Sequence, residues 1–351
     1  MRKAFIKSIA DVFHIIPDAL ELAARIRTAS ELLPPTPPPS SLPPPTPTQP
    51  SLPQPIFQEH LCKVNCAALS VDGRHIIAGG SNTTAEVRST ATGDLISIFD
   101  EHPDQVKCVA ISPNGEWAAS GGGIIDPRVR IWRLNDGKQL VVCQGWWFQN
   151  HSSEVRAVAV SPDNRTVASV SFDGGVKLWN ANTGKFLATL KHDARGVCSL
   201  AFSLCGAVLA SGDIDGKVKL WSVEKSNPLG EFKFHRDIVT GLAFLPGGKN
   251  LVSSSRDGTA KVFDWCTGKM EWVFYDHASP VTCMAAFPGG EKVATGGEDG
   301  NVRIWNPRRK TCERVLPKHG YSVDFVAAAS DESTLVSGCC GRLVRVWDMK
   351  P

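Results

Sequence analysis

One aromatic position returns at a nearly fixed interval through most of this 351-residue chain, with successive spacings of 44, 47, 42, 42, 42 and 42 residues. A constant period of about 20 to 50 residues indicates a repeat architecture, in which each unit is one supersecondary element that packs on its neighbours. The repeat therefore has to be explained before any local motif. The aligned positions are Arg88, Trp132, Trp179, Trp221, Phe263, Trp305 and Trp347.

Each period is predicted to contain four short strands. Residues 155–160 and 166–169 are apolar runs separated by a turn sequence at 161–164, and the dipeptide Asp173-Gly174 is a hairpin signal. Residues 176–179 then alternate between apolar and polar side chains, which is the period of a half-buried strand, and 185–190 supplies the fourth strand. Because 42% of the residues are hydrophobic, the chain can bury a large core.

This pattern resembles the WD40 repeat, and seven copies cover about residues 56–351. The resemblance implies an all-β fold, a seven-bladed propeller whose four-stranded blades, with strands a to d, surround a channel. Seven copies supply strands a, b and c, but only six fourth strands follow them. We expect residues 54–60, which contain Ile56 and Phe57, to pair with the last blade and close the ring.

The resemblance also implies a buried hydrogen-bond chain in each complete blade. It joins a His before strand a, a Ser or Thr on strand b, an Asp in the b–c turn and the Trp on strand c. Blade five has Phe263 at the Trp position, blade seven has Gly341 at the Asp position, and blade one keeps only His60. The complete sets are His102, Ser120, Asp126, Trp132; His151, Ser169, Asp173, Trp179; His192, Ser211, Asp215, Trp221; and His277, Thr295, Asp299, Trp305.

A Ser, a His and an Asp are also the components of a hydrolase triad. Here the set recurs blade after blade, whereas a catalytic site occurs once, and buried polar groups need partners wherever they occur. The sequence contains no nucleophile elbow, phosphate loop or metal-spaced Cys/His cluster. We therefore expect a protein that is not an enzyme and that needs neither a metal nor a cofactor.

Blade two departs from the other repeats at two loops. It carries two extra residues between Ser120 and Asp126, and about six extra residues before His151. In the propeller family the b–c and d–a loops open on one face, the top face, so we expect the two inserts to form one apolar patch. The patch could fold back on the rim, bind a partner or receive this chain's own head. Its residues are Ile124, Ile125, Trp146, Trp147 and Phe148.

Other candidate partner-binding residues come from the family's variable top-face positions. The residue before each turn Asp maps to Phe172, Ile214, Arg256 and Glu298, and the d–a loops add Arg236 and Tyr321. For any single one of them, an ordinary solvated loop residue is the simpler interpretation.

The N-terminal region differs in composition from the repeats. Residues 1–33 have apolar positions at helical spacing and are interpreted as an amphipathic head, interrupted near Pro17, that docks on the propeller, a partner helix or a membrane surface. Residues 34–55 hold 12 of the 24 prolines and no charge, which predicts an extended polyproline linker. This linker is either a plain spacer or, through residues 42–47, a ligand for an aromatic groove. The expected domains are thus 1–33, 34–55 and a propeller over 56–351.

Charge and cysteine content restrict the partners and the cellular compartment that we expect for the protein. The net charge is +3, without the strongly basic surface that nucleic acid requires. The 11 cysteines form no paired framework, and no apolar run is long enough to span a membrane. We expect a cytoplasmic, or nuclear, protein that is a monomeric propeller within a complex.

The function that these features predict is a protein–protein interaction scaffold or adaptor. Two alternatives stay open. One is a substrate receptor of a cullin-RING ubiquitin ligase, since Trp347-Asp348-Met349-Lys350 is one residue away from that family's motif. The other is a signalling subunit similar to G-protein β subunits, whose layout also places a helical head before seven blades.

Overall fold

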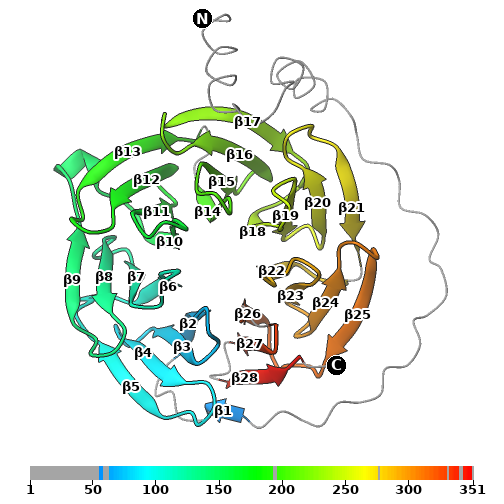
Figure 1. Ribbon diagram of the computed structural model, residues 1–351, viewed down its shortest axis with the longest axis horizontal. Helices are drawn as coiled ribbons and strands as arrows, with labels where there is room; N and C mark the ends of the chain where they lie inside the picture. The colour runs from blue at the N-terminus through cyan, green and yellow to red at the C-terminus, as the bar shows by residue number, and fades with distance from the viewer. Residues whose placement is uncertain are drawn as a thin grey trace, which may run out of the picture.

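The computed structural model describes residues 55–57, 63–192, 196–275, 277–329, 332–339 and 343–349. The predicted head at 1–33 and the linker up to residue 54 lie outside these residues. Within them the chain forms seven four-stranded antiparallel sheets arranged radially around a central channel (Figure 1). The predicted seven-bladed propeller is therefore confirmed.

The strands of each blade follow one another outward from the channel in chain order, except that the outermost strand of blade seven is β1. The innermost strands, a, are β2 (Val64–Leu69), β6 (Val106–Ile111), β10 (Val155–Val160), β14 (Val197–Phe202), β18 (Val239–Phe244), β22 (Val281–Ala286) and β26 (Val323–Ala328). Strands b are β3 (His75–Gly80), β7 (Trp117–Gly122), β11 (Thr166–Ser171), β15 (Val208–Asp213), β19 (Asn250–Ser255), β23 (Val293–Gly297) and β27 (Thr334–Cys339).

The outer half of each blade contains the strand with the repeated aromatic residue and the edge strand. Strands c are β4 (Ala85–Ser89), β8 (Val129–Arg133), β12 (Gly175–Asn180), β16 (Lys217–Ser222), β20 (Ala260–Asp264), β24 (Val302–Asn306) and β28 (Leu343–Asp348). Strands d are β5 (Leu95–Phe99), β9 (Gln139–Cys143), β13 (Phe186–Lys191), β17 (Asn227–Lys233), β21 (Met270–Phe274), β25 (Thr311–Leu316) and, for blade seven, β1 (Pro55–Phe57).

The ring is closed by a strand from the N-terminal side of the chain. β1 pairs antiparallel with β28, with Pro55 opposite Arg345 and Phe57 opposite Val344. The outermost strand of blade seven thus comes from the residues that were expected to supply it. This pairing covers part of the edge of β28, whose backbone groups would otherwise be open.

The b–c turns follow the chemistry that the sequence predicts. Gly216, after Asp215, has φ of +81°, and a Cβ there would meet the carbonyl oxygen of His235 at 2.3 Å. Only glycine combines this left-handed backbone with so close an approach. The Asp-Gly dipeptide therefore allows the b–c turn of blade four to lie against the loop that leads from blade four into blade five.

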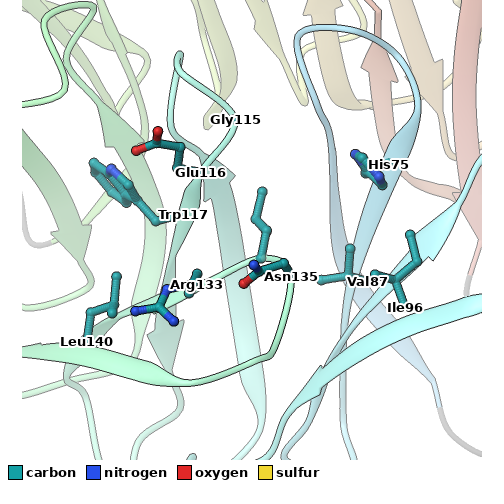
Figure 2. Close-up of a pocket in the computed structure, with 10 residues that line it drawn as sticks. His75, Val87, Ile96, Gly115, Glu116, Trp117, Arg133, Asn135 and Leu140 are labelled. Carbon is teal, nitrogen blue, oxygen red and sulfur yellow. The ribbon is translucent and has the colours of Figure 1, made fainter.

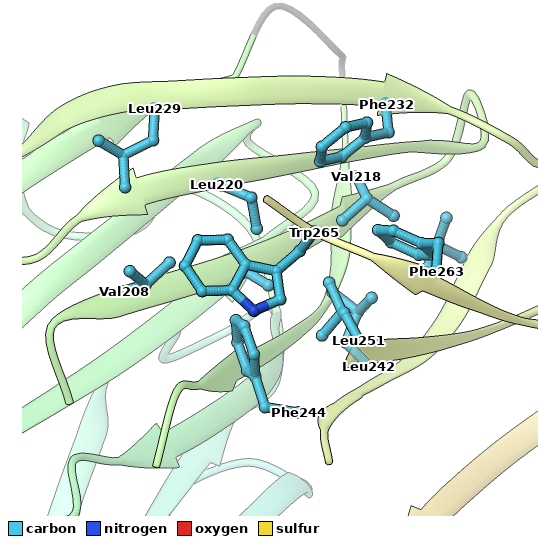
Figure 3. Close-up of a cluster of buried hydrophobic side chains, with 12 residues drawn as sticks. Val208, Val218, Leu220, Leu229, Phe232, Leu242, Phe244, Leu251, Phe263 and Trp265 are labelled. Carbon is cyan, nitrogen blue, oxygen red and sulfur yellow. The ribbon is translucent and has the colours of Figure 1, made fainter. Parts of the chain in front are cut away.

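The core lies between the sheets. In the largest cluster, Val208, Leu220 and Leu229 of blade four pack against Phe244 and Trp265 of blade five (Figure 3). The Trp265 indole N–H donates to the carbonyl of Gly248 at 2.8 Å, so even this large residue is buried without an unpaired donor. Each blade is stabilised chiefly by its neighbours, as expected of a repeat protein.

Candidate functional site

In blade three the predicted hydrogen-bond chain is complete. The Trp179 indole N–H donates to the Ser169 hydroxyl oxygen at 2.8 Å, which lies 2.8 Å from Nε2 of His151. Nδ1 of His151 lies 2.9 Å from Oδ2 of Asp173. Because a carboxylate only accepts, Nδ1–H donates to Asp173, and Nε2 accepts from Ser169. Burial raises the pKa of Asp173, but the hydrogen bonds from His151, Ser152 and Gly175 outweigh this effect and lower it.

Blade four requires a correction to the predicted set. Ser211 accepts from Trp221 at 2.7 Å and lies 2.9 Å from Nε2 of His192, but Asp213 rather than Asp215 lies beside that histidine, 3.3 Å from Nδ1. Asp213 ends strand b, and its Oδ1 accepts from the backbone N–H groups of Asp215 and Lys217. The carboxylate that caps the b–c turn therefore also approaches the histidine, while Asp215 is exposed.

In blades two and six an arginine separates the histidine from the aspartate. Arg303 donates to Asp299 at 2.7 Å and lies 2.8 Å from Nδ1 of His277, while the His277–Asp299 distance is 3.6 Å. Thr295 accepts from Trp305 and lies 2.8 Å from Nε2 of His277. The equivalent contacts in blade two join Ser120 to His102 and Trp132, Arg130 to Nδ1 of His102, and Arg130 to Asp126.

The blades with incomplete sets keep part of the chain. His235 contacts Ser253 and Asp257, and Phe263 packs against Phe232 and Phe234 where the other blades have a tryptophan. In blade seven Ser337 joins Trp347 to His319. His60 and Gly341 lie outside the described residues.

These hydroxyl groups are placed for structural work. Ser120, Ser169, Ser211, Ser253, Thr295 and Ser337 have no exposed surface, so no substrate reaches them. Four of the cysteines, Cys66, Cys108, Cys198 and Cys283, line the channel. Burial raises the pKa of Cys283 to about 12, so this thiol is protonated at neutral pH and is a poor nucleophile.

The longer insert of blade two forms a short, well-anchored turn. The 3-10 helix η2 (Trp147–Gln149) is held by a hydrogen bond from the Trp146 N–H to Oε1 of Gln149 at 2.8 Å and by a bond from the Gly145 N–H to Oδ1 of Asn150 at 3.0 Å. Trp146, Trp147 and Phe148 are nevertheless 72%, 86% and 62% exposed. These aromatic side chains have therefore not folded back onto the rim.

The turn lies at the outer edge of the ring, where blades two and three meet. The Gln144 N–H donates to the carbonyl of Gly184 in blade three at 3.1 Å, and a Cβ on Gly145 would lie 3.1 Å from the Cβ of Phe186. From there the chain runs inward to β10 beside the channel (Figure 1). We call residues 146–148 the aromatic turn.

The shorter insert has a different anchor. The N–H of Ile125 donates to Oδ2 of Asp104 at 2.9 Å, in the loop that enters blade two, and the side chains of Ile124 and Ile125 are mostly exposed. The two inserts thus share exposure but are attached to different loops. Their union in one patch stays a prediction.

The remaining candidates lie around the channel. Arg156 stacks over the Phe172 ring at 4.9 Å, and Phe172 and Ile214 both approach Gly196. Arg256 and Glu298 form an ion pair of 2.5 Å between blades five and six. Arg236 and Tyr321 are exposed, with the Arg236 N–H donating to Asp257. Phe172, Arg256 and Glu298 line a hollow of about 630 Å³ with the channel wall.

Sequence reasoning missed the basic residue two positions before the tryptophan. Blades two to seven have Arg130, Lys177, Lys219, Lys261, Arg303 and Arg345 there, and blade one has Glu86. The repeat itself carried this signal, since a long cation inside a buried blade requires an acidic or carbonyl partner. Arg345, for example, donates to the carbonyls of Pro317 and Lys318.

Seven radial blades with tryptophan–hydroxyl–histidine links define a WD40-repeat β-propeller. Residues 63–348 match the family model described as the IFT122 first beta-propeller, and the chain belongs to this family. In the part of the chain that the structure describes, no helix has the length and apolar character to cross a bilayer.

Two curated proteins resemble short stretches of the chain. Pre-mRNA-processing factor 19 homolog 2 of Arabidopsis thaliana is 40% identical over 72 residues, which is 20% of this chain and 13% of that protein. Ribosome assembly protein 4 of Saccharomyces cerevisiae is 49% identical over 39 residues, which is 11% of this chain and 8% of that protein. The chain thus matches only a small part of either relative's length.

Proposed function

We propose that the protein is a non-catalytic scaffold that binds other proteins, with the aromatic turn as one contact site. WD40 propellers of this family type typically mediate protein–protein interactions. The observation that carries the proposal is the exposure of three consecutive large aromatic side chains on a turn whose backbone is fixed by Gln149 and Asn150.

The energetics favour a partner over solvent at this turn. Burying one side chain of this size stabilises a complex by about 1.5 to 3 kcal/mol. Because the turn is already ordered, little conformational entropy is lost when it is buried. Trp and Phe anchors at the centre of an interface are also the residues that dominate binding energy.

A pull-down from cell extract tests the scaffold role. The variant replaces Trp146, Trp147 and Phe148 with Ser, and we expect it to lose at least one partner that the wild type retains, with its thermal unfolding midpoint unchanged. The matched control replaces three scattered exposed residues, Leu187, Leu204 and Val315, with Ser. An identical partner set for the wild type and both variants would contradict the role of the aromatic turn.

The top face supports a second contact area of the same scaffold. Phe172, Arg256 and Glu298 surround the channel mouth and combine an aromatic face with both signs of charge, which suits a polar peptide. The cullin-ligase and G-protein-β alternatives stay predictions. The first is based on a sequence motif alone, and the second depends on a head that lies outside the described part of the chain.

A further inference from the structure

An apolar groove opens between blades one and two on the bottom face, which carries the a–b and c–d turns. It has a volume of about 520 Å³. Trp117, Arg133 and Leu140 line its blade-two side, Val87 and Ile96 line its blade-one side, and Asn135 lies between them (Figure 2).

The tryptophan in this groove is specific to blade two. Trp117 begins strand b and pairs with Arg133 at the end of strand c. At the same place blade three has Thr166 and blade five has Asn250, which pair with Asn180 and Asp264. In blade two, a large aromatic residue beside blade one thus takes the place of the small polar residues that close the turns in those blades.

The groove offers apolar surface together with an indole donor, and its charged side chains, Arg133 and Glu116, already have hydrogen-bond partners. Arg133 is bonded to Asp136, and Glu116 accepts from Asn114. The indole N–H of Trp117 has no hydrogen-bond partner among the described residues. A suitable ligand is therefore uncharged, presents apolar rings and supplies carbonyl acceptors rather than donors.

A segment of this chain has that chemistry. Residues 34–54 contain 11 prolines and no charged residue. Proline has no N–H, and a polyproline helix leaves its carbonyl groups free to accept, so such segments bind in grooves that combine aromatic faces with N–H donors.

The segment also joins the ring from the correct side. Pro55 pairs with Arg345, which is nearer the end of β28 than Val344, the partner of Phe57. β1 therefore enters the ring from the face on which strands c end, and this is the face that carries the groove. The 21 residues could extend about 65 Å as polyproline, whereas neighbouring sheets pack about 10 Å apart, and the groove adjoins the blade next to blade seven.

We propose that the groove between blades one and two binds the chain's own proline-rich segment, residues 34–54. Attachment through β1 gives the segment a millimolar effective concentration, which suffices for a contact that would be weak between separate molecules. Because each proline ring restricts φ, a proline-rich segment also loses less backbone entropy on docking than an ordinary segment.

Photo-crosslinking in the full-length protein tests this assignment. A photoreactive phenylalanine derivative replaces Leu140 in the groove, and the matched control carries it at Leu187, the equivalent exposed residue of strand d in blade three. We expect an intramolecular crosslink, in monomeric protein, from position 140 to a peptide within 34–54, and a yield at position 187 about tenfold lower. Adding Trp117→Ala should lower the yield at position 140 about tenfold, the factor that a loss of about 1.4 kcal/mol gives.

Three results would overturn the proposal. They are equal yields at positions 140 and 187, a crosslink to the segment only in dimers, and a yield that Trp117→Ala leaves unchanged in a variant whose circular dichroism shows a folded propeller. In the dimer case the occupant is a second copy.

Discussion

Blades three and six share the same histidine, hydroxyl, aspartate and tryptophan pattern, yet their hydrogen bonds run in opposite directions. The difference is one basic residue, Lys177 in blade three and Arg303 in blade six. In blade three Nδ1–H of His151 donates to Asp173. In blade six Arg303, which has only donors, lies against Nδ1 of His277, so Nδ1 accepts and Nε2–H donates to Thr295.

The repeated motif therefore fixes the positions of the side chains but not the positions of their protons. The Arg blades also share an electrostatic consequence. Burial, with the nearby guanidinium, lowers the pKa of His102 to about 3 and that of His277 to about 4. In blade three burial likewise lowers the pKa of His151. The aspartate of each blade, Asp126, Asp173 or Asp299, opposes this effect.

The largest expected effect tests the link that the two blades share. Trp179→Ala and Trp305→Ala should each lower the free energy of unfolding by about 3 to 5 kcal/mol, since both side chains are buried and both donate to the strand-b hydroxyl. Urea denaturation gives the two values. Trp272→Ala, at an exposed position, is the control and should cost about 1 kcal/mol. Clearly different losses of unfolding free energy for Trp179→Ala and Trp305→Ala would show that the basic residue also affects the hydrogen bond from the tryptophan to the hydroxyl.

The acid of blade three gives the next largest effect. Asp173→Ala removes the acceptor of His151 Nδ1–H and of the Ser152 N–H, and it should cost about 1 to 3 kcal/mol. Asp215→Ala is the matched control at the same place in blade four. Because Asp215 is exposed and does not contact His192, its replacement should change the free energy of unfolding by less than about 0.5 kcal/mol. Equal losses in the two variants would restore Asp215 as the acid of blade four.

The smallest effect at neutral pH is also the most specific. Arg303→Lys should change the free energy of unfolding at pH 7 by less than about 1 kcal/mol, yet let His277 Nδ1–H turn to Asp299 as in blade three. The pKa of His277 should then rise from about 4. Nitrogen-15 NMR of the imidazole ring reports the tautomer directly.

The same variant changes the response to acid. The pKa of His277 in the folded protein lies below the value of about 6.5 in the unfolded chain. The contribution of neutral His277 to the free energy of unfolding is therefore complete above pH 6.5. It is lost as the pH falls toward 4, by up to about 1.4 kcal/mol per pH unit. Arg303→Lys should make the free energy of unfolding, measured by urea denaturation, fall less steeply between pH 6.5 and pH 5. Lys177→Arg in blade three is the reciprocal control and should make this fall steeper. Unchanged slopes in both variants would mean that burial alone sets these pKa values.

The fold could be predicted almost completely because it depends on periodic features. The spacing of the tryptophans, the Asp-Gly turns and the shortage of one fourth strand predicted the blades and the closing strand at Pro55–Phe57. The acid of blade four could not be assigned in this way. The sequence 212–216 offers two aspartates, and only the turn geometry brings Asp213 rather than Asp215 toward His192.

The candidate surfaces were less predictable than the fold. The extra loop length identified Trp146, Trp147 and Phe148 as an insert but left open whether they fold back on the rim. Their exposure and the contact of Gln144 with Gly184 come from the structure. The groove at Trp117 has no signal in the chain-wide pattern. It forms because one large residue, Trp117, stands at a turn position and faces the sheet of the neighbouring blade.

The pairing of β1 with β28 also determines when the molecule can become circular. Its two strands are separated by most of the chain, so a ribosome releases Pro55–Phe57 long before it has made Leu343–Asp348. Early blades can assemble during synthesis because their contacts are local, whereas the seventh sheet waits for the last repeat. A nascent molecule thus carries an unmatched edge at each end of its row of blades until the seventh repeat has been synthesised, and we expect chaperones to engage it in that interval.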